Sequence, residues 1–196
     1  MGRSSFGAGP SRRERPVRGM VLAALFAALT AVGAQIQTPL PFSPVPIVLS
    51  NFFAILSGLV LGPRLGVTSQ VVYLLLGAAG VPVFAGMHGG LQVLAGPTGG
   101  YLIGFVLAAA AAGALRGPRP DTRRAFIAAA VAGAVIYLPG IPYLAASTGM
   151  GIRRALLVGM LPFLPGDAAK VVIAGIIAPA LQRAVQTQAA AAGVRL

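Results

Sequence analysis

Long apolar runs, separated by short breaks that carry arginine, dominate this sequence. A helix needs about 20 mostly apolar residues to cross the hydrocarbon core of a bilayer. Six runs approach that length, and they cover Met20–Ile36, Ile47–Leu61, Leu65–Val83, Leu91–Leu115, Ala125–Ala146 and Leu156–Leu181. The sequence therefore predicts an all-α, polytopic membrane protein, a bundle of six transmembrane helices.

The balance of apolar and charged residues excludes most soluble classes. Hydrophobic residues make up 57% of the 196 residues and charged residues 9%, against roughly 25% charged in a typical globular protein. The net charge of +12 does not indicate a nucleic-acid partner, because the arginines lie at the chain ends and in the breaks between apolar runs. That placement is typical of the flanks of membrane spans.

The chain divides into three expected parts. Residues 1–18 are a basic, disordered cytoplasmic tail, residues 19–183 form the six-helix membrane domain, and residues 184–196 form a second cytoplasmic tail. Small residues at Ala31–Ala34 leave open a cleaved signal peptide. Further apolar runs follow, so an uncleaved first span is the preferred interpretation.

The arginines also predict orientation. With a cytoplasmic N-terminus, twelve of the fifteen basic residues fall on the inner side, Arg153 and Arg154 fall on the outer side, and Lys170 lies within the last span. Basic residues favour the cytoplasmic side. We therefore expect a multi-pass protein of a bacterial-type cell membrane with both termini cytoplasmic.

Several chemistries are excluded by what the sequence lacks. There is no Cys, one His and three acidic residues, so neither a metal centre nor a Ser-His-Asp apparatus is expected. The single lysine follows Ala169 and no phosphate-binding loop exists. We expect no catalytic residue, no metal and no cofactor, and uphill transport would take its energy from elsewhere.

Two outer connections are expected to act together. Gln37–Pro46 contains four prolines and should be stiff and extended. Gly80–Gly90 is apolar and rich in glycine. Both loops are predicted on the outer side, where together they can form a lid over a pocket.

The most informative polar residues are Asp167 and Lys170. They are three residues apart, so on a helix they share a face. They are either a self-neutralising ion pair or the polar end of a small-molecule site. Because one of three acids and the only lysine lie here, and charges inside a span are costly, we favour the binding site. The pair can accept N–H groups and donate to a carboxylate or carbonyl.

Other candidates are less specific. Gly96, Gly100 and Gly104 form a small-residue stripe for a flat ligand or a neighbouring helix. Tyr101 beside the stripe can stack on a ring or donate a hydrogen bond. Among polar residues in or near the spans, His88 and Asn51 are either ligand contacts or ordinary solvated or packed groups. The predicted substrate-binding residues are Asp167, Lys170, Tyr101, His88, Asn51 and Gly99.

The first span carries a ridge of small residues. Ala23, Ala27 and Ala31 recur at intervals of four. Such a ridge lets helices approach closely. It serves either packing within the chain or docking to a partner membrane protein, and the sequence leaves the two equal.

The order of several motifs resembles the BioY family of biotin transport proteins. The resemblance runs from about Arg18 to Leu181. The motifs are Val45–Ile47, Gly58–Gly66, Tyr73–Ala78 with Val81–Gly86, Gly96–Tyr101, and Gly166–Lys170.

The resemblance implies a fold and a function. BioY proteins are six-helix, biotin-binding components of energy-coupling factor (ECF) transporters, which work with a transmembrane coupling protein and ATP-binding-cassette ATPases. It implies that Asp167 and Lys170 contact biotin and that the alanine ridge docks on the coupling protein. The chain departs from the family pattern at Ser50-Asn51, where Gln-Thr is frequent, and at Met87-His88, where a basic residue is frequent.

Other functions are less consistent with the sequence. A self-contained secondary transporter or channel for another solute is the main alternative, and small size, no visible inverted repeat and few internal charges argue against it. A membrane enzyme lacks a catalytic set.

Overall fold

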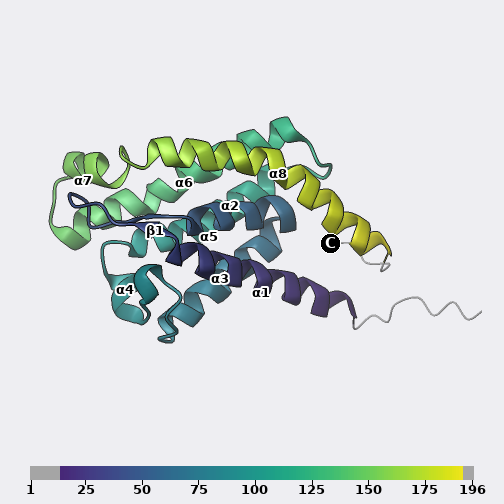
Figure 1. Ribbon diagram of the computed structural model, residues 1–196, viewed down its shortest axis with the longest axis horizontal. Helices are drawn as coiled ribbons and strands as arrows, with labels where there is room; N and C mark the ends of the chain where they lie inside the picture. Colours follow the sequence, from purple (N-terminus) through teal and green to yellow (C-terminus); the bar gives the residue numbers. More distant parts are fainter. Residues whose placement is uncertain (1–13, 192–196) are drawn as a thin grey trace, which may run out of the picture.

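The computed structural model describes residues 14–191, and they are mostly helical (Figure 1). The α-helices are α1 Glu14–Gln35, α2 Ser50–Leu61, α3 Pro63–Ala78, α4 Leu91–Ala95, α5 Gly99–Leu115, α6 Thr122–Thr148, α7 Ile152–Gly159 and α8 Leu164–Ala191. A 3₁₀ turn, η1, covers Ala85–Met87, and two short strands, β1 Gln37–Thr38 and β2 Ile47–Val48, pair antiparallel.

Three of the described helices are long and apolar enough to cross a membrane. The qualifying segments are Val17–Gln35, Thr122–Thr148 and Leu164–Gln188, and α2 and α5 are shorter apolar helices. Large apolar side chains such as Met20, Leu138 and Ile176 are about 60% exposed or more. A soluble monomer rarely exposes so much apolar surface, so the chain is a multi-pass membrane protein.

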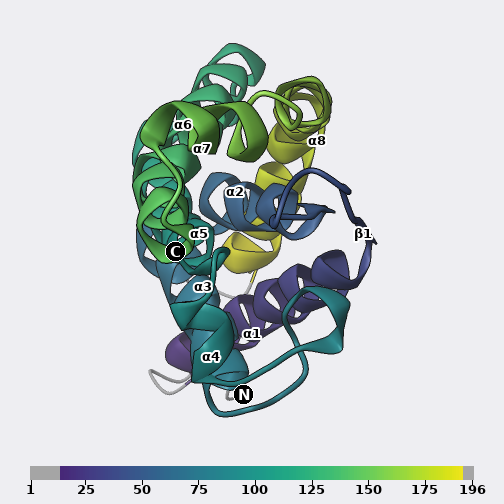
Figure 2. The ribbon, with the colours of Figure 1, turned by 90° about the vertical axis from the view of Figure 1, so that its left-hand side faces the viewer.

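Helix α2 lies in the middle of the bundle (Figure 2). It packs against α1, α3, α5, α6 and α8. All but two of its residues are buried, and the exceptions, Asn51 and Phe53, lie in its first turn. Because α2 is enclosed, it carries Asn51 to the interior of the protein rather than toward lipid.

Proline and glycine divide two of the predicted spans. The run Leu91–Leu115 is two helices, because Pro97 disfavours a helical conformation at Gly96, which is extended. The run Leu156–Leu181 is likewise interrupted between α7 and α8, at Met160–Phe163, a segment that contains Pro162.

Two other predicted boundaries also shift. Helix α3 ends at Ala78, before Gly80, whose φ of 97° a helix cannot accommodate. Helix α2 begins at Ser50 rather than at Ile47, which lies in β2. At Pro97, Pro162 and Gly80, therefore, the conformation that the backbone can adopt determines where a helix ends, and the length of the apolar run does not.

The two expected tails are helical where the structure describes them. Helix α1 begins at Glu14, so residues 14–18 are not a disordered tail, and α8 continues through residues 184–191. The rest of the expected tails, residues 1–13 and 192–196, lies outside the described residues. The start of α1 and the end of α8 are joined, since Arg18 donates to the carbonyl of Gln188 at 2.6 Å and to its side-chain oxygen at 3.0 Å.

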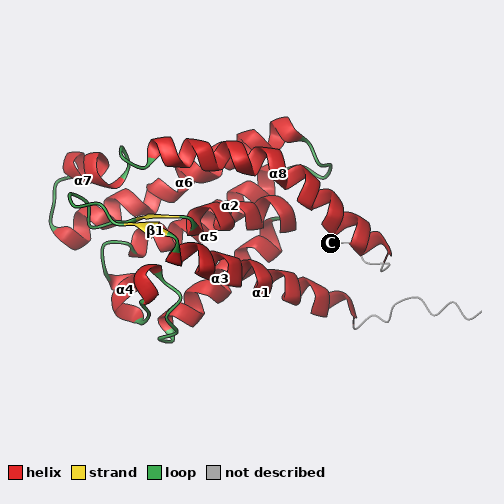
Figure 3. Cartoon of the chain, in the orientation of Figure 1, coloured by secondary structure: helices red, strands yellow, loops and turns green. Residues whose placement is uncertain are grey.

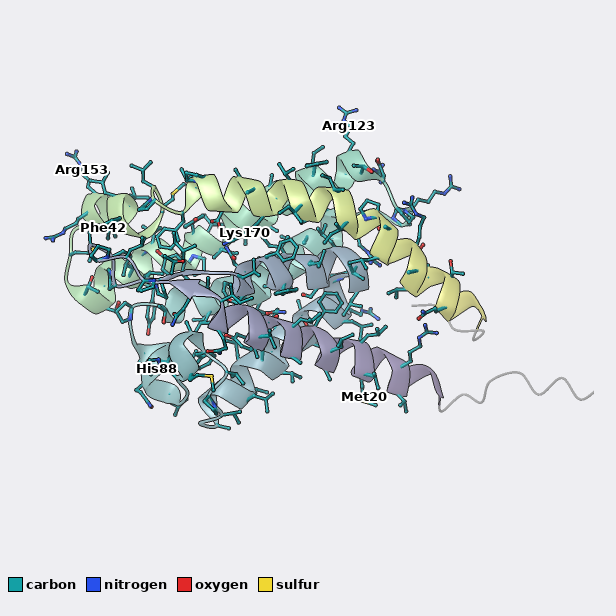
Figure 4. The ribbon with its side chains drawn as sticks, in the orientation of Figure 1. Met20, Phe42, His88, Arg123, Arg153 and Lys170 are labelled. Atoms are coloured by element: carbon teal, nitrogen blue, oxygen red, sulfur yellow. The ribbon has the colours of Figure 1, made fainter. Side chains whose placement is uncertain are left out.

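Both strands and most of the loops gather at one end of the bundle, away from the start of α1 and the end of α8, while the loop between α5 and α6 lies at the opposite end (Figure 3). The β1–β2 hairpin closes the segment 37–48, and η1 and α4 lie at the same end. Figure 4 places His88, Phe42 and Arg153 at this end and Arg123 at the opposite end. This loop-rich end is the predicted outer side.

Candidate functional site

Four polar side chains from three helices meet inside the bundle, and we call them the polar quartet: Asn51, Tyr137, Asp167 and Lys170. Oδ1 of Asp167 accepts from Nδ2 of Asn51 at 2.9 Å and from Nζ of Lys170 at 3.1 Å. Its other oxygen, Oδ2, accepts from the hydroxyl of Tyr137 at 2.5 Å. Nζ of Lys170 also donates to Oδ1 of Asn51 at 2.8 Å and to the carbonyl of Val48 at 2.7 Å.

Local sequence explains how the charged pair is placed. Pro165 lies in the first turn of α8, where its missing N–H costs nothing and its fixed φ suits the helix. Asp167 follows in the same turn, where a negative charge is favoured by the helix dipole. The spacing of three puts Lys170 on the same face, and the two side chains are 16% and 12% exposed. The pair therefore points into the protein.

The quartet lies beside two adjoining cavities. The smaller, of about 40 Å³, is lined by Asn51, Tyr137, Asp167 and Lys170 among others. The larger has a volume of about 450 Å³, within the range of about 300–1,000 Å³ usual for small-molecule sites. The residues that line both cavities are Val45, Pro46, Val48, Tyr101 and Phe105.

Both predicted lid loops line the larger cavity. The first contributes Pro39, Leu40 and Pro44, and the second contributes Phe84 and Gly86, among others. The first loop is not extended as predicted, because it folds back as the β1–β2 hairpin with a turn in which the N–H of Ser43 donates to the carbonyl of Leu40. The two loops and α4 therefore form one wall of the larger cavity, and their role as a lid on the outer side stays a prediction.

Gln35, near the end of α1, holds the second loop in place. Its side-chain nitrogen donates to the carbonyls of Val83 at 3.4 Å and Phe84 at 3.1 Å, and its oxygen accepts from the backbone N–H of Met87 at 3.0 Å. Gln35 does not line either cavity. It acts on the cavity through the loop that forms its wall.

Tyr101 and His88, both predicted to bind substrate, line the larger cavity. Tyr101 is 8% exposed, its hydroxyl donates to the carbonyl of Gly159 at 2.9 Å, and its ring makes an edge contact with Tyr137 at 6.2 Å between centroids. Nδ1 of His88 lies 2.9 Å from the carbonyl oxygen of Ala85. That contact leaves the opposite ring nitrogen available to a ligand.

Gly99, also predicted to bind substrate, lines neither cavity. A Cβ there would overlap the carbonyl of Leu94 and lie 3.1 Å from the Tyr143 ring. Gly99 therefore allows α4 to pack on the start of α5. Gly99 lies two residues before Tyr101 and faces another direction on the helix, because successive residues differ by about 100°.

The glycine stripe serves helix packing at two of its three positions. A Cβ at Gly100 would meet the carbonyl of Pro139 at 2.5 Å, and one at Gly104 would meet the carbonyl of Ile136 at 2.7 Å. Both partners are on α6, so the stripe brings α5 and α6 into close contact. Only Gly96 lines the larger cavity.

The predicted docking ridge on α1 is mostly buried within the chain. Ala23 is 2% exposed and Ala27 is 3% exposed, while Ala31 is partly buried. Packing within the chain therefore accounts for Ala23 and Ala27. The exposed small residues of α1 are the neighbouring Ala24 and Ala28.

Tyr137 is the site residue that the sequence analysis missed. It is one of two tyrosines in an apolar run, with no spacing that relates it to Asp167. The signal available was its isolation, since Tyr137 and Tyr143 are the only side chains with polar atoms between Ala125 and Ala146. A buried tyrosine hydroxyl normally has a partner.

Comparison with known proteins assigns the chain to a family. The BioY family matches residues 8–187. The chain belongs to the BioY family. The described residues include no group of three or more His, Cys, Asp or Glu side chains able to hold a metal ion.

Relatives within the BioY family match nearly their whole length. The probable biotin transporter BioY of Pyrococcus horikoshii is 47% identical over 161 residues, which is 82% of this chain and 94% of the relative. The biotin transporter BioY of Thermotoga maritima is 43% identical over 168 residues, 85% and 97% of the two chains.

A solved structure shows the same fold. The crystal structure of the S-component for biotin from an ECF-type ABC transporter matches with a TM-score of 0.79 and 24% identity. The match covers 88% of this chain and 95% of that one. The overall fold of this chain is thus one that an S-component of an ECF-type ABC transporter adopts.

Proposed function

We propose that this chain is the high-affinity biotin-binding membrane component of an ECF-type biotin uptake system. The observation that carries the proposal is the polar quartet beside a 450 Å³ cavity in a chain of the BioY family. The two relatives described above are named biotin transporters.

The chemistry of biotin suits this arrangement. Biotin carries a ureido ring with N–H and carbonyl groups, an apolar sulfur ring and a carboxylated chain. The quartet offers the Asp167 carboxylate as an acceptor and the Lys170 ammonium as a donor. Between the two ends, Tyr101, Phe105 and the proline-rich loop supply apolar surface.

The side chains of the quartet bond to one another in this structure, so biotin can reach them only if some of these hydrogen bonds break. Lys170 donates three hydrogen bonds and both oxygens of Asp167 accept. The smaller cavity, about 40 Å³, has room for water-sized groups only. Biotin would replace some of these bonds, and the shared wall of Val45, Pro46 and Val48 would shift outward as the two cavities become one.

In the membrane we propose six spans with both termini cytoplasmic. The spans are α1, α2, α3, α5 with the short α4, α6 and α8. Arg123 lies at one end of the molecule, and Phe42 and His88, which belong to the two predicted outer loops, lie at the other (Figure 4). The predicted orientation assigns twelve of the fifteen basic residues to the side of Arg123. That asymmetry supports a cell-membrane protein whose cavity opens outward.

The proposed partners are a transmembrane coupling protein and ATP-binding-cassette ATPases. The chain has no phosphate-binding loop of its own, since its only lysine is in the quartet. We place the docking surface on the exposed side of α1, at Ala24 and Ala28, because Ala23 and Ala27 are buried. A channel or secondary transporter would need no such surface.

Equilibrium binding tests the proposal. The purified chain is titrated with labelled biotin and with a panel of other vitamins, and only biotin should bind at sub-micromolar concentration. Asp167→Asn and Lys170→Ala should each weaken binding at least about thirtyfold, because truncating one partner of a buried hydrogen-bonded charge pair costs about 2–5 kcal/mol.

A matched control separates the site from general charge effects. Asp121→Asn makes the same chemical change at an exposed carboxylate at the start of α6, far from the cavities, and should bind like the parent. Equal affinity for another vitamin, or parent-like binding by both quartet variants, would overturn the proposed function.

A further inference from the structure

Two adjacent arginines occupy the outer end of the molecule. Arg153 and Arg154 are the second and third residues of α7, and both are exposed. Figure 4 places Arg153 at the same end as Phe42 and His88. His88 lines the larger cavity and Phe42 belongs to the proline-rich loop that covers it.

Neither arginine forms an ion pair with any of the described residues. The ion pairs among the described residues are Arg124–Asp121 and Lys170–Asp167. Of the three acidic residues, Asp167 is held in the quartet, Glu14 begins α1, and Asp121 precedes α6. The 27 residues of α6 separate Asp121 from α7, a distance of about 40 Å at 1.5 Å per residue.

A second arginine pair, in contrast, has an acidic side chain beside it. Arg123 and Arg124 are likewise the second and third residues of a helix, α6, at the inner end. There Asp121 accepts from the backbone N–H of Arg123 at 3.1 Å and lies 3.9 Å from Arg124. The residue before α7 is Gly151, which has no side chain to offer.

The outer pair is therefore unfavourable for local structure and for topology. Positive charge at the start of a helix opposes the helix dipole, and arginine on the outer side opposes the cytoplasmic preference of basic residues. No contact within the described chain compensates. The charges point instead to a partner outside the chain, and that partner is an anion.

The position of α7 connects this charge to the cavity. The last residue of α7, Gly159, accepts the hydroxyl of Tyr101, which lines both cavities. Arg153 is six residues, or about 9 Å, along the helix from Gly159. The screening length at physiological ionic strength is about 8 Å, so the charge of Arg153 is only partly screened over that separation. No Lys or Arg lines the larger cavity in the described chain.

We infer that Arg153 and Arg154 form an anion-collecting surface that steers a carboxylate-bearing substrate into the larger cavity. The inference rests on the proposed function, since biotin is such a carboxylate. Charges outside a binding site act mainly on the association rate, and their effect falls with ionic strength. The pair is thus a determinant of capture, separate from the quartet that holds the substrate.

Association kinetics test the inference. The full chain in discs of neutral phosphatidylcholine is mixed with tritiated biotin, and binding is followed by rapid filtration at low salt. The double variant Arg153→Gln/Arg154→Gln should associate about threefold more slowly or worse, with an unchanged dissociation rate. The difference in association rate between parent and variant should vanish at about 0.5 M salt, where the screening length is only a few ångströms.

Two controls make the result specific. Arg123→Gln/Arg124→Gln removes the matched inner pair and should leave association unchanged. Biotin amide, which lacks the carboxylate charge, should associate equally fast with the parent and with the outer variant. A loss that also appears with the amide or the inner variant, or no loss at all, would overturn the inference.

Lipid phosphate is the competing anionic partner of the arginine pair, and the same experiment distinguishes it from the substrate carboxylate. A slower association that appears only in discs of anionic phosphatidylglycerol would assign the pair to lipid headgroups and refute steering. Failure of the parent to bind biotin at equilibrium would instead refute the proposed function. Normal equilibrium binding with unchanged association rates would refute steering alone.

Discussion

The strongest test of the quartet is the removal of its cation. In Lys170→Met the side chain keeps much of its length and loses its ammonium. Asp167 then keeps two donors, Asn51 and Tyr137, but no positive charge. The carbonyl of Val48 and the side-chain oxygen of Asn51 also lose a donor. The variant therefore leaves a mostly buried carboxylate uncompensated.

The expected loss of stability follows from burial. The two charged side chains are 12% and 16% exposed, and breaking such a pair costs about 3–5 kcal/mol. For a chain of this length, 1 kcal/mol shifts the melting temperature by about 2–4 °C. Lys170→Met should therefore melt about 6–20 °C lower. The double variant Asp167→Asn/Lys170→Met should recover at least half of the loss, because no charge remains buried.

Melting in detergent without biotin is followed by far-ultraviolet circular dichroism, because the chain has no Trp for fluorescence. Arg123→Met, at an exposed position on α6, controls for loss of a cation and should stay within about 2 °C of the parent. If Lys170→Met and the double variant melt at the same temperature, the carboxylate does not depend on the ammonium and the reasoning fails.

Three further outcomes are expected. Tyr137→Phe should weaken biotin binding about tenfold in titrations, since one hydrogen bond to a charged group is worth about 1.5 kcal/mol or more; parent-like affinity would remove Tyr137 from the site. Gly104→Ala should lower the melting temperature, because its Cβ would press on α6 at a cost of about 1–3 kcal/mol. Gly166→Ala, where no atom lies within 4 Å, should raise it, and the opposite order would contradict the packing argument. Arg116→Met should cost about 1.5–3 kcal/mol in thermal melts, because Arg116 donates to two carbonyls at the end of α2; an unchanged melt would show that these bonds are dispensable.

The sequence predicted the helices well where apolar length and backbone chemistry agree. The apolar run Ala125–Ala146 lies entirely within α6, and Asp121 and Gly149 cap the helix at its two ends. The boundaries failed at Pro97 and Gly80, where hydropathy ignores what the backbone can adopt. Both signals were present in the sequence, so these errors came from giving length priority over proline and glycine.

The site was predictable in part, for a definite reason. Asp167 and Lys170 share a helix, so their spacing alone places them on one face. Tyr137 comes from another helix, and its meeting with Asp167 depends on how α6 packs on α8, which no local pattern encodes. The same limit applies to Ala23 and Ala24: adjacent small residues look equivalent in the sequence, and tertiary packing buries one and exposes the other.

The enclosed position of α2 has a consequence for the lipid environment. Twelve residues make a helix of about 18 Å, well short of a hydrocarbon core of about 30 Å. A helix in contact with lipid would have to tilt or distort the bilayer at that length. Because α2 touches other helices on all sides, bilayers of different acyl-chain length would strain α1, α6 and α8 first. Asn51 would stay in register with its partners while the surrounding membrane thins or thickens.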